Sequence, residues 1–270
     1  MDGGALEQRL RDRGRALGEA GLSLSTLVFD LDETLWDWAA PLGRSLLPVE
    51  HCEYVTVRTP LLWLLEGVAE RGGGRLVAWT SGYGFRIDQV CAGLPPLAQL
   101  FGVGPGDETE NLPNVFTRLG FLRALEQRPD LIPNPEGRWL AQKIPGMPTA
   151  GGKPLVDAAR VLVDDKESNC RRFVDAGDGR SAVWLRGTSR VWKKSVTLYR
   201  IPAPPPRRWA DGVGDALDAI ARGKVGLYPV DPVHSEHPVL PVRVSVSHRR
   251  LWRDWLAPAR AVERLLAARR

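Results

Sequence analysis

Short apolar runs alternate with longer amphipathic segments over the first 190 residues. Four runs have the length and composition of buried β-strands: residues 27–29, 75–79, 161–163 and 182–185. The segments around them predict helices: residues 5–20, 60–71, 85–92, 115–126 and 167–175. Runs that are apolar throughout are typical of parallel strands buried on both faces. Strands that alternate with helices predict an α/β fold with a mainly parallel sheet flanked by helices.

The same pattern divides the chain into three parts. We expect an N-terminal helix within residues 1–23 and an α/β core over residues 24–190. Residues 94–152 of this core are less regular and are expected to hold a small insert. Residues 191–270 form a C-terminal extension of unknown role, with two expected helices, near 210–222 and 248–268.

Charge is distributed unevenly between these parts. The chain of 270 residues carries 37 Lys and Arg against 32 Asp and Glu, a net charge of +5. From residue 186 to the end there are 17 basic and 7 acidic residues, which leaves 20 basic and 25 acidic residues before it. A basic extension on an acidic body is either an ordinary solvated surface or a surface that binds a polyanion such as nucleic acid. Both interpretations stay open at this point.

The composition excludes several classes of protein. Hydrophobic residues make up 43% and charged residues 26%, which is ordinary for a globular chain. No apolar run approaches the roughly 18 residues that span a bilayer, and the first residues lack the apolar stretch of a secretory signal. Cys52, Cys91 and Cys170 lie far apart and form no CxxC pair. We expect a reduced, cytoplasmic protein that does not associate with membranes.

Acidic and hydroxyl side chains follow three of the predicted strands. They are Asp30, Asp32 and Thr34 after the first strand, Thr80 and Ser81 after the second, and Asp164, Asp165 and Asn169 after the third, with Lys153 eleven residues before Asp164. Parallel sheets bind ligands outside the carboxyl ends of their strands, so these groups should meet at one edge. Carboxylates held that close cannot all stay ionised unaided. Mg²⁺, which prefers carboxylate, water and phosphate oxygens, removes this repulsion, so the pattern predicts a Mg²⁺ site for a phosphate substrate.

This arrangement predicts phosphoryl transfer through a side chain of the protein. Asp30 can attack phosphorus and form an aspartyl-phosphate. Residues i and i+2 of an extended segment point the same way, so Asp32 can serve as general acid and then as general base. Thr80 or Ser81, together with Lys153, would bind the phosphoryl oxygens.

Other residues of these segments are expected to support the reacting groups. Asp165 is the expected direct metal ligand, with Asp164 beside it or behind it. Asn169 is expected to orient one of these carboxylates by a hydrogen bond, and Thr34 supports the loop after the first strand. Trp36 and Trp38, next to that loop, either pack beneath it or shape the substrate entrance.

In wording and order, these segments resemble the four motifs of the haloacid dehalogenase (HAD) superfamily of phosphohydrolases. The matching segments are VFDLDETLW (28–36), LVAWTSG (76–82), Lys153 and VLVDDKESN (161–169). The resemblance covers roughly residues 24–187. The first motif is similar to that of the magnesium-dependent phosphatase branch, and the short spacing from Lys153 to the Asp pair is similar to that of the carboxy-terminal-domain protein phosphatases.

The resemblance implies a Rossmannoid fold, a nucleophile at Asp30 and an acid/base at Asp32. It also implies Mg²⁺ bound by the Asp30 side chain, the Asp32 backbone carbonyl and Asp165. An aspartate at position 32 is what phosphatases of this superfamily have and its dehalogenases lack. Only 45 residues separate Thr34 from Thr80. We therefore expect a small cap or none, and a site open to a bulky substrate such as a nucleic-acid end or a phosphoprotein.

The resulting hypothesis is a Mg²⁺-dependent phosphomonoester hydrolase, and two alternatives remain beside it. The first is a phosphotransferase or mutase on the same fold. The second is a nucleic-acid-binding module with an idle site, in which the basic extension makes the contact.

Overall fold

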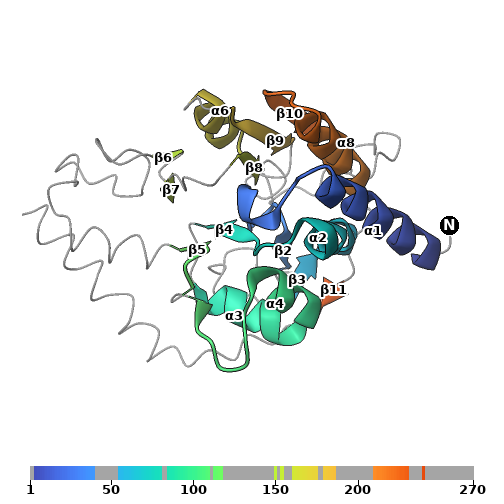
Figure 1. The fold of residues 1–270 in the computed structure, drawn as a ribbon. Helices are drawn as coiled ribbons and strands as arrows, with labels where there is room; N and C mark the ends of the chain where they lie inside the picture. The colour runs from blue at the N-terminus through green and yellow to red at the C-terminus, as the bar shows by residue number, and fades with distance from the viewer. Residues whose placement is uncertain are drawn as a thin grey trace, which may run out of the picture.

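The centre of the fold is a six-stranded sheet in which every pairing is parallel. The computed structural model describes residues 3–39, 54–80, 84–109, 112–117, 149–150, 153–154, 160–175, 179–186, 209–230 and 239–240. The strands of the main sheet, in spatial order, are β10 (Leu227–Val230), β9 (Ser181–Leu185), β8 (Val161–Asp164), β1 (Leu27–Asp30), β4 (Val77–Trp79) and β5 (Val115–Phe116) (Figure 1). The predicted α/β fold with a parallel sheet is confirmed, and it has a Rossmann-like core.

Helices flank this sheet along its whole width. They are α1 (Gly3–Glu19), α2 (Thr59–Gly72), α3 (Gly84–Gly93), α4 (Pro95–Phe101), α6 (Glu167–Asp175) and α8 (Trp209–Ala221), and a short 3₁₀ turn, η1 (Leu24–Thr26), leads into β1. In Figure 1, α6 and α8 lie at the β9–β10 end of the sheet, and α3 and α4 lie at the β5 end. None of the helices in the described part of the chain combines the length and apolar character needed to cross a bilayer.

Alternate residues of the central strands face two separate apolar layers. Leu27 and Phe29 of β1 belong to the larger layer, which is built with residues of α1, α2, α3, α4 and α8. Val28 belongs to the smaller layer, which it shares with Cys170 and Phe173 of α6. Because all four residues of β1 are buried, the strand is held from both faces, as its unbroken apolar sequence predicts.

Helices α1 and α2 pack at very short range because glycines lie at their crossing. A Cβ atom added to Gly67 would stand 2.1 Å from the Arg11 carbonyl oxygen, and one added to Gly14 would stand 2.1 Å from the Leu64 carbonyl oxygen. No side chain fits at such distances, so these two positions need glycine. The close contact places α2 against the core through Leu61, a residue that is 1% exposed.

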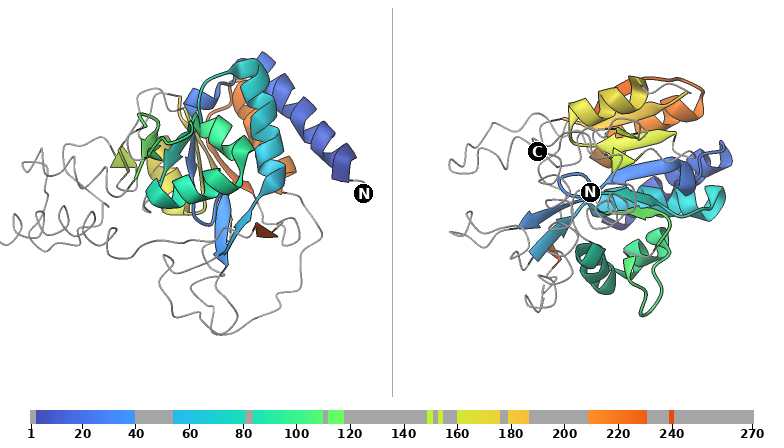
Figure 2. Two further views of the ribbon diagram at one scale, coloured as in Figure 1. Left: turned by 90° about the horizontal axis from the view of Figure 1, so that it is seen from below. Right: turned by 90° about the vertical axis from the view of Figure 1, so that its left-hand side faces the viewer.

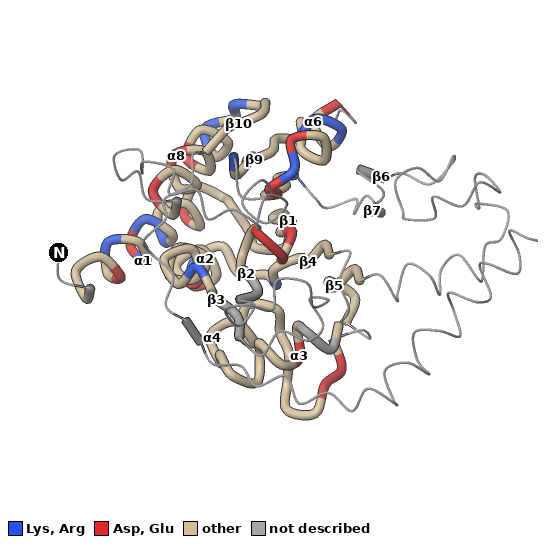
Figure 3. Tube along the Cα trace, turned by 180° about the vertical axis from the view of Figure 1, so that it is seen from behind, with Lys and Arg blue, Asp and Glu red and all other residues tan. Residues whose placement is uncertain are grey.

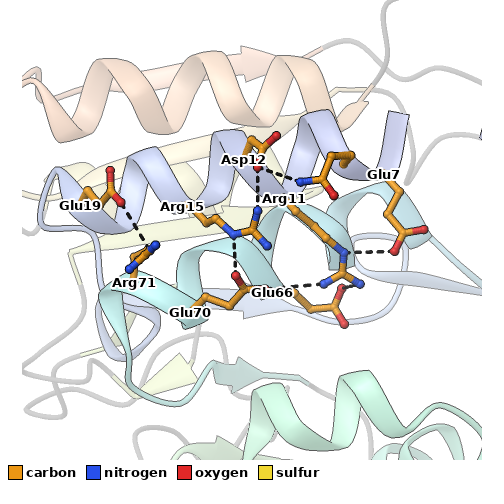
Figure 4. A network of polar contacts seen from close by, with 9 residues as sticks. Glu7, Arg11, Asp12, Arg15, Glu19, Glu66, Glu70 and Arg71 are labelled. Atoms are coloured by element: carbon orange, nitrogen blue, oxygen red, sulfur yellow. Dashed lines mark hydrogen bonds and ion pairs between the residues drawn. The ribbon is translucent and has the colours of Figure 1, made fainter. Parts of the chain in front are cut away.

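A network of ion pairs borders the same crossing (Figure 4). Arg11 pairs with Glu66 at 2.7 Å, and Arg15 pairs with Glu70 at 2.5 Å and with Asp12 at 2.7 Å. Pairs that remain accessible to solvent, such as those of Arg15, each contribute little to stability, typically about 0–1 kcal/mol. The ion pairs of Arg11 with Glu66 and of Arg15 with Glu70 nevertheless join α1 to α2.

Two smaller antiparallel sheets accompany the main one. β2 (Trp36–Ala39), β3 (Tyr54–Val57) and β11 (Val239–Leu240) form a three-stranded sheet in the order β11-β3-β2, and β6 (Thr149–Ala150) pairs with β7 (Lys153–Pro154). The β2–β3 pair extends away from the main sheet (Figure 2). It starts immediately after the loop that follows β1, so it ties that loop to a second layer of structure.

The structure corrects three of the expected boundaries. Residues 209–230 are not a separate extension, because α8 buries Val213 and Leu217 in the larger apolar layer and β10 adds an edge strand to the main sheet. The expected insert does not begin at residue 94, since α4 and β5 belong to the core. The helix expected from about Val115 to Glu126 does not begin at Val115, because Val115 and Phe116 form β5, and residues 118–126 lie outside the described residues. Most of the remaining insert, and the helix expected near 248–268, lie outside the described residues.

Candidate metal centre

Asp30 lies at the carboxyl end of the central strand, between two other strand ends. β1 pairs on one side with β8, where Phe29 faces Val163, so Asp164 follows directly beside Asp30. On its other side β1 pairs with β4, where Asp30 faces Trp79, and Thr80 is the next residue along the chain. The acidic segments at the end of β1 and between β8 and α6 lie close to each other in Figure 3. Parallel pairing therefore brings together groups that are more than 130 residues apart in sequence.

The loop after β1 is closed tightly by its own backbone. The Leu31 carbonyl accepts hydrogen bonds from the backbone N–H groups of Leu35, at 2.8 Å, and Trp36, at 3.1 Å. Glu33 adopts a left-handed backbone conformation, with φ of 65°, and its N–H donates to the Trp36 carbonyl at 2.7 Å. This turn directs the buried Thr34 hydroxyl to Asp30 Oδ2, at 3.3 Å.

Three carboxylates meet at this edge of the sheet. One oxygen from each of Asp30, Asp164 and Asp165 lies within 4.8 Å of the other two. The three residues are 6%, 0% and 3% exposed. Three negative charges cannot be held this close and this far from water without compensation, so the cluster must bind protons or a cation.

The two neighbouring carboxylates of this cluster have different partners. Both oxygens of Asp164 accept hydrogen bonds from the protein, Oδ1 from the Lys166 backbone N–H at 2.7 Å and Oδ2 from the Asn169 side-chain amide at 2.9 Å. Asp165 Oδ2 is buried and has no hydrogen-bond partner. One buried carboxylate oxygen here accepts no hydrogen bond, and two further carboxylates lie beside it. Such a group of oxygen atoms suits a divalent cation that prefers oxygen ligands. Asp164 is thus held by two protein donors, whereas one oxygen of Asp165 has none.

The environment of Asp165 strongly favours its protonated form when no cation is present. Burial, and next the charge of Asp164, raise its pKa to about 8, while Lys166 acts against this and the nearby Glu33 carboxyl adds to it. A cation placed among these oxygens would reverse the balance and favour the ionised form.

Asp32 does not join this cluster, although four converging carboxylates were expected. Its side chain is partly buried, and its Oδ1 accepts a hydrogen bond from the indole Nε1–H of Trp36 at 3.1 Å. The turn after β1 explains the difference, because the chain leaves the extended conformation between Asp30 and Trp36 and residue 32 need not face the same way as residue 30. The Asp32 carboxylate is therefore held apart from the three that can share a cation.

The structure describes part of the expected phosphate-binding group. Thr80 is buried at the end of β4, and its backbone N–H donates to the Phe116 carbonyl at 2.9 Å. Ser81 lies outside the described residues. The backbone of Lys153 forms β7, whose partner β6 lies against α6, but the Lys153 side chain is also outside the described part.

Sequence reasoning missed two residues of this centre. Glu33, whose backbone is left-handed, interacts with Asp165 through its carboxyl, a contact that a sequence pattern does not show. Trp184 is missed because its role depends on strand register: β9 places it opposite Asp164, and its indole N–H donates to the Asp165 carbonyl at 3.2 Å. The place of Glu33 between Asp32 and Thr34 in the segment DLDET (residues 30–34) is the one feature of the sequence that could have pointed to it. Trp36, which was expected either to pack beneath the loop or to shape the entrance, is buried under the loop at 1% exposure.

No protein-family model, curated protein or solved structure matches the chain. The resemblance to the HAD superfamily is confined to the four sequence segments, and none of these comparisons tests it.

Proposed function

We propose that the protein is a Mg²⁺-dependent phosphomonoester hydrolase that works through a phosphorylated Asp30. The observation that carries this proposal is the meeting of Asp30, Asp164 and Asp165, one of which has a buried oxygen without a donor. Oxygen ligands of this kind suit a hard divalent cation. The sequence resemblance supports the same reaction, because it assigns the nucleophile to the residue that the sheet places at the centre of this edge.

Asp30 and Asp165 would hold the cation, with Asp164 behind them. When bound, Mg²⁺ supplies positive charge that offsets the charge of the cluster and of the transferring phosphoryl group. Asp164 keeps its position through its bonds to the Lys166 N–H and to Asn169. Thr80, which follows the neighbouring strand β4, would donate a hydrogen bond from its hydroxyl to a phosphoryl oxygen.

The reaction would proceed in two steps at Asp30. In the first, a carboxylate oxygen of Asp30 bonds to phosphorus, the ester P–O bond breaks, and the leaving oxygen takes a proton from Asp32. In the second, water bonds to phosphorus and gives its proton to Asp32, and the bond between phosphorus and Asp30 breaks. The Thr34 hydroxyl, which donates to Asp30 Oδ2, would orient the nucleophile in both steps.

Replacement of Asp30 tests this proposal. Asp30→Asn keeps the shape of the side chain and removes the nucleophile, so we expect turnover of an aryl phosphate to fall to background while the fold is retained by circular dichroism. Asp175→Asn, at an exposed position at the end of α6, is the matched control and should keep full activity. Activity in Asp30→Asn equal to that of the control would refute the assignment. An added alcohol that captures the phosphoryl group in place of water would identify the phosphotransferase alternative.

A further inference from the structure

The indole of Trp36 is joined to the side chain that the proposed reaction uses as its acid. Its Nε1–H donates to Asp32 Oδ1 at 3.1 Å. Trp36 is 1% exposed and belongs to the large apolar layer, so its ring cannot turn away without opening the core. The donor of the hydrogen bond to Asp32, the Trp36 indole, is therefore fixed in place.

The backbone of Trp36 fixes the same loop. Its N–H donates to the Leu31 carbonyl at 3.1 Å, and its carbonyl accepts from Glu33 at 2.7 Å. Trp36 also begins β2, where it pairs with Val57 of β3. The donor is thus anchored by the loop, by the strand pair and by the core, while its acceptor, Asp32, is only partly buried.

We propose that Trp36 is a positioning residue that holds the Asp32 carboxyl where it protonates the leaving oxygen. This inference rests on the proposed hydrolase function. An acid acts only when its proton lies within hydrogen-bond reach of the oxygen that departs. A side chain on a loop reaches that precision when a rigid neighbour fixes its rotamer, and the buried indole N–H supplies this constraint.

The inference predicts a dependence on the leaving group that a general structural role would not produce. An alkyl phosphate must have its leaving oxygen protonated as the P–O bond breaks, because an alkoxide is a poor leaving group. An aryl phosphate with an electron-withdrawing ring releases a stable phenolate and hardly needs the acid. The value of kcat/KM reports steps only up to the first irreversible one, here the formation of phospho-Asp30, so it isolates the acid role of Asp32 from its later role as base.

The decisive variant is Trp36→Phe, which keeps an aromatic ring and removes the N–H donor. We expect kcat/KM for an alkyl phosphate to fall about 10- to 100-fold, and that for p-nitrophenyl phosphate to fall less than about 3-fold. Trp184→Phe is the matched control, because it removes an indole N–H that bonds the Asp165 carbonyl instead. Its effect should be the same for both substrates and should be relieved by higher Mg²⁺ concentration.

A double-substitution cycle with Asp32→Asn separates positioning from packing. If Trp36 acts through Asp32, Trp36→Phe causes no further loss of alkyl phosphate kcat/KM once Asp32→Asn is present. If Trp36→Phe does not fold, replacing Trp36 by benzothienylalanine, whose sulfur stands where the N–H was, preserves the ring volume and carries the same prediction.

Different outcomes overturn different parts of the account. Equal losses on both substrates, or losses that add in the double variant, would overturn the positioning role and leave the hydrolase function standing. A wild-type chain that hydrolyses neither substrate with Mg²⁺ would overturn the proposed function, and this inference with it.

Discussion

Asp165 and Asp164 are adjacent in sequence but have opposite relations to the protein. Asp164 has both oxygens bonded to protein donors, whereas one oxygen of Asp165 is buried without any. The sequence predicted Asp165 as the direct metal ligand, but it does not show the hydrogen bonds that distinguish the two carboxylates, because these depend on the direction in which α6 begins. The turn into α6 gives the Lys166 N–H to Asp164, and Asn169, further along α6, donates to the same carboxyl.

Replacing Asp165 by a side chain that cannot ionise should stabilise the metal-free protein and abolish its response to Mg²⁺. Asp165→Asn has nearly the same shape and is neutral at every pH, so folding no longer has to place a proton on a buried carboxylate beside Asp164. We expect a melting temperature equal to or above that of the wild type in EDTA, with no rise on adding Mg²⁺. Thermal unfolding with and without Mg²⁺ measures both, and Asp175→Asn should behave as wild type. A full Mg²⁺ response in Asp165→Asn would show that the cation binds elsewhere.

The raised pKa of Asp165 predicts how stability changes with pH. Its pKa rises from the ordinary 3.8 to about 8 on folding, so the folded metal-free chain keeps a proton that the unfolded chain releases. The resulting contribution to stability is complete below the unfolded pKa and is lost as the pH rises through the folded pKa. Relative to Asp165→Asn, the melting temperature of the metal-free wild type should therefore fall between about pH 4 and about pH 8.

The response to Mg²⁺ should have the opposite trend over the same range. Because the cation competes with the proton on Asp165, the rise in melting temperature caused by Mg²⁺ should increase with pH until Asp165 is ionised. A series of melts at each pH, in EDTA and in saturating Mg²⁺, measures this increase. A response that is independent of pH would contradict the assignment of Asp165 as a ligand.

At the scale of elements, the contact between α1 and α2 depends on the absence of side chains. Gly67→Ala would place a methyl group 2.1 Å from the Arg11 carbonyl oxygen, which is backbone and cannot move alone. We expect a loss of about 1–3 kcal/mol in the free energy of unfolding, as for other overpacked contacts. Gln8→Ala, at an exposed position of α1, should change it by less than about 0.5 kcal/mol. Urea unfolding measures the free energy of unfolding of both variants. Equal values would show that α1 and α2 can move apart without loss of stability.

Elements with a strong local pattern were predicted well, and short elements were not. The helix at α6 was predicted with its observed bounds, since both of its ends are marked by polar residues in the sequence. β5 has two residues, and its pairing with β4 is a tertiary contact that no local pattern marks. The site was predicted in outline because parallel strands must end at one edge. The partners of Asp32 and Asp165 depend on a left-handed turn and on strand register, which a sequence pattern does not specify.

At the scale of the whole molecule, the α/β unit extends past the boundary that sequence placed at residue 190. α8 and β10 complete the sheet and its larger apolar layer, and Arg13 of α1 pairs with Asp218 and Asp215 of α8. Ion pairs thus join the first helix to α8, so the late helix belongs to the same unit as the N-terminal one.

Truncation tests the extent of this unit. A chain ending at residue 190 would lose the burial of Val213, Leu217 and Val230, each of which contributes roughly 1.5–3 kcal/mol. We expect it to lose cooperative unfolding, whereas the full chain should retain it. Differential scanning calorimetry of both chains decides this. A shorter chain with the melting temperature of the longer one would restore the original boundary.

The central claim is that phosphorus becomes bonded to Asp30 during turnover. The most direct measurement is a rapid acid quench of the protein mixed with an aryl phosphate and Mg²⁺, followed by reduction of the acyl-phosphate and peptide mass spectrometry. We predict modification of Asp30, dependent on Mg²⁺, in the wild type and its absence from Asp30→Asn. Steady turnover with an unmodified Asp30, or with the phosphoryl group on another residue, would contradict this account.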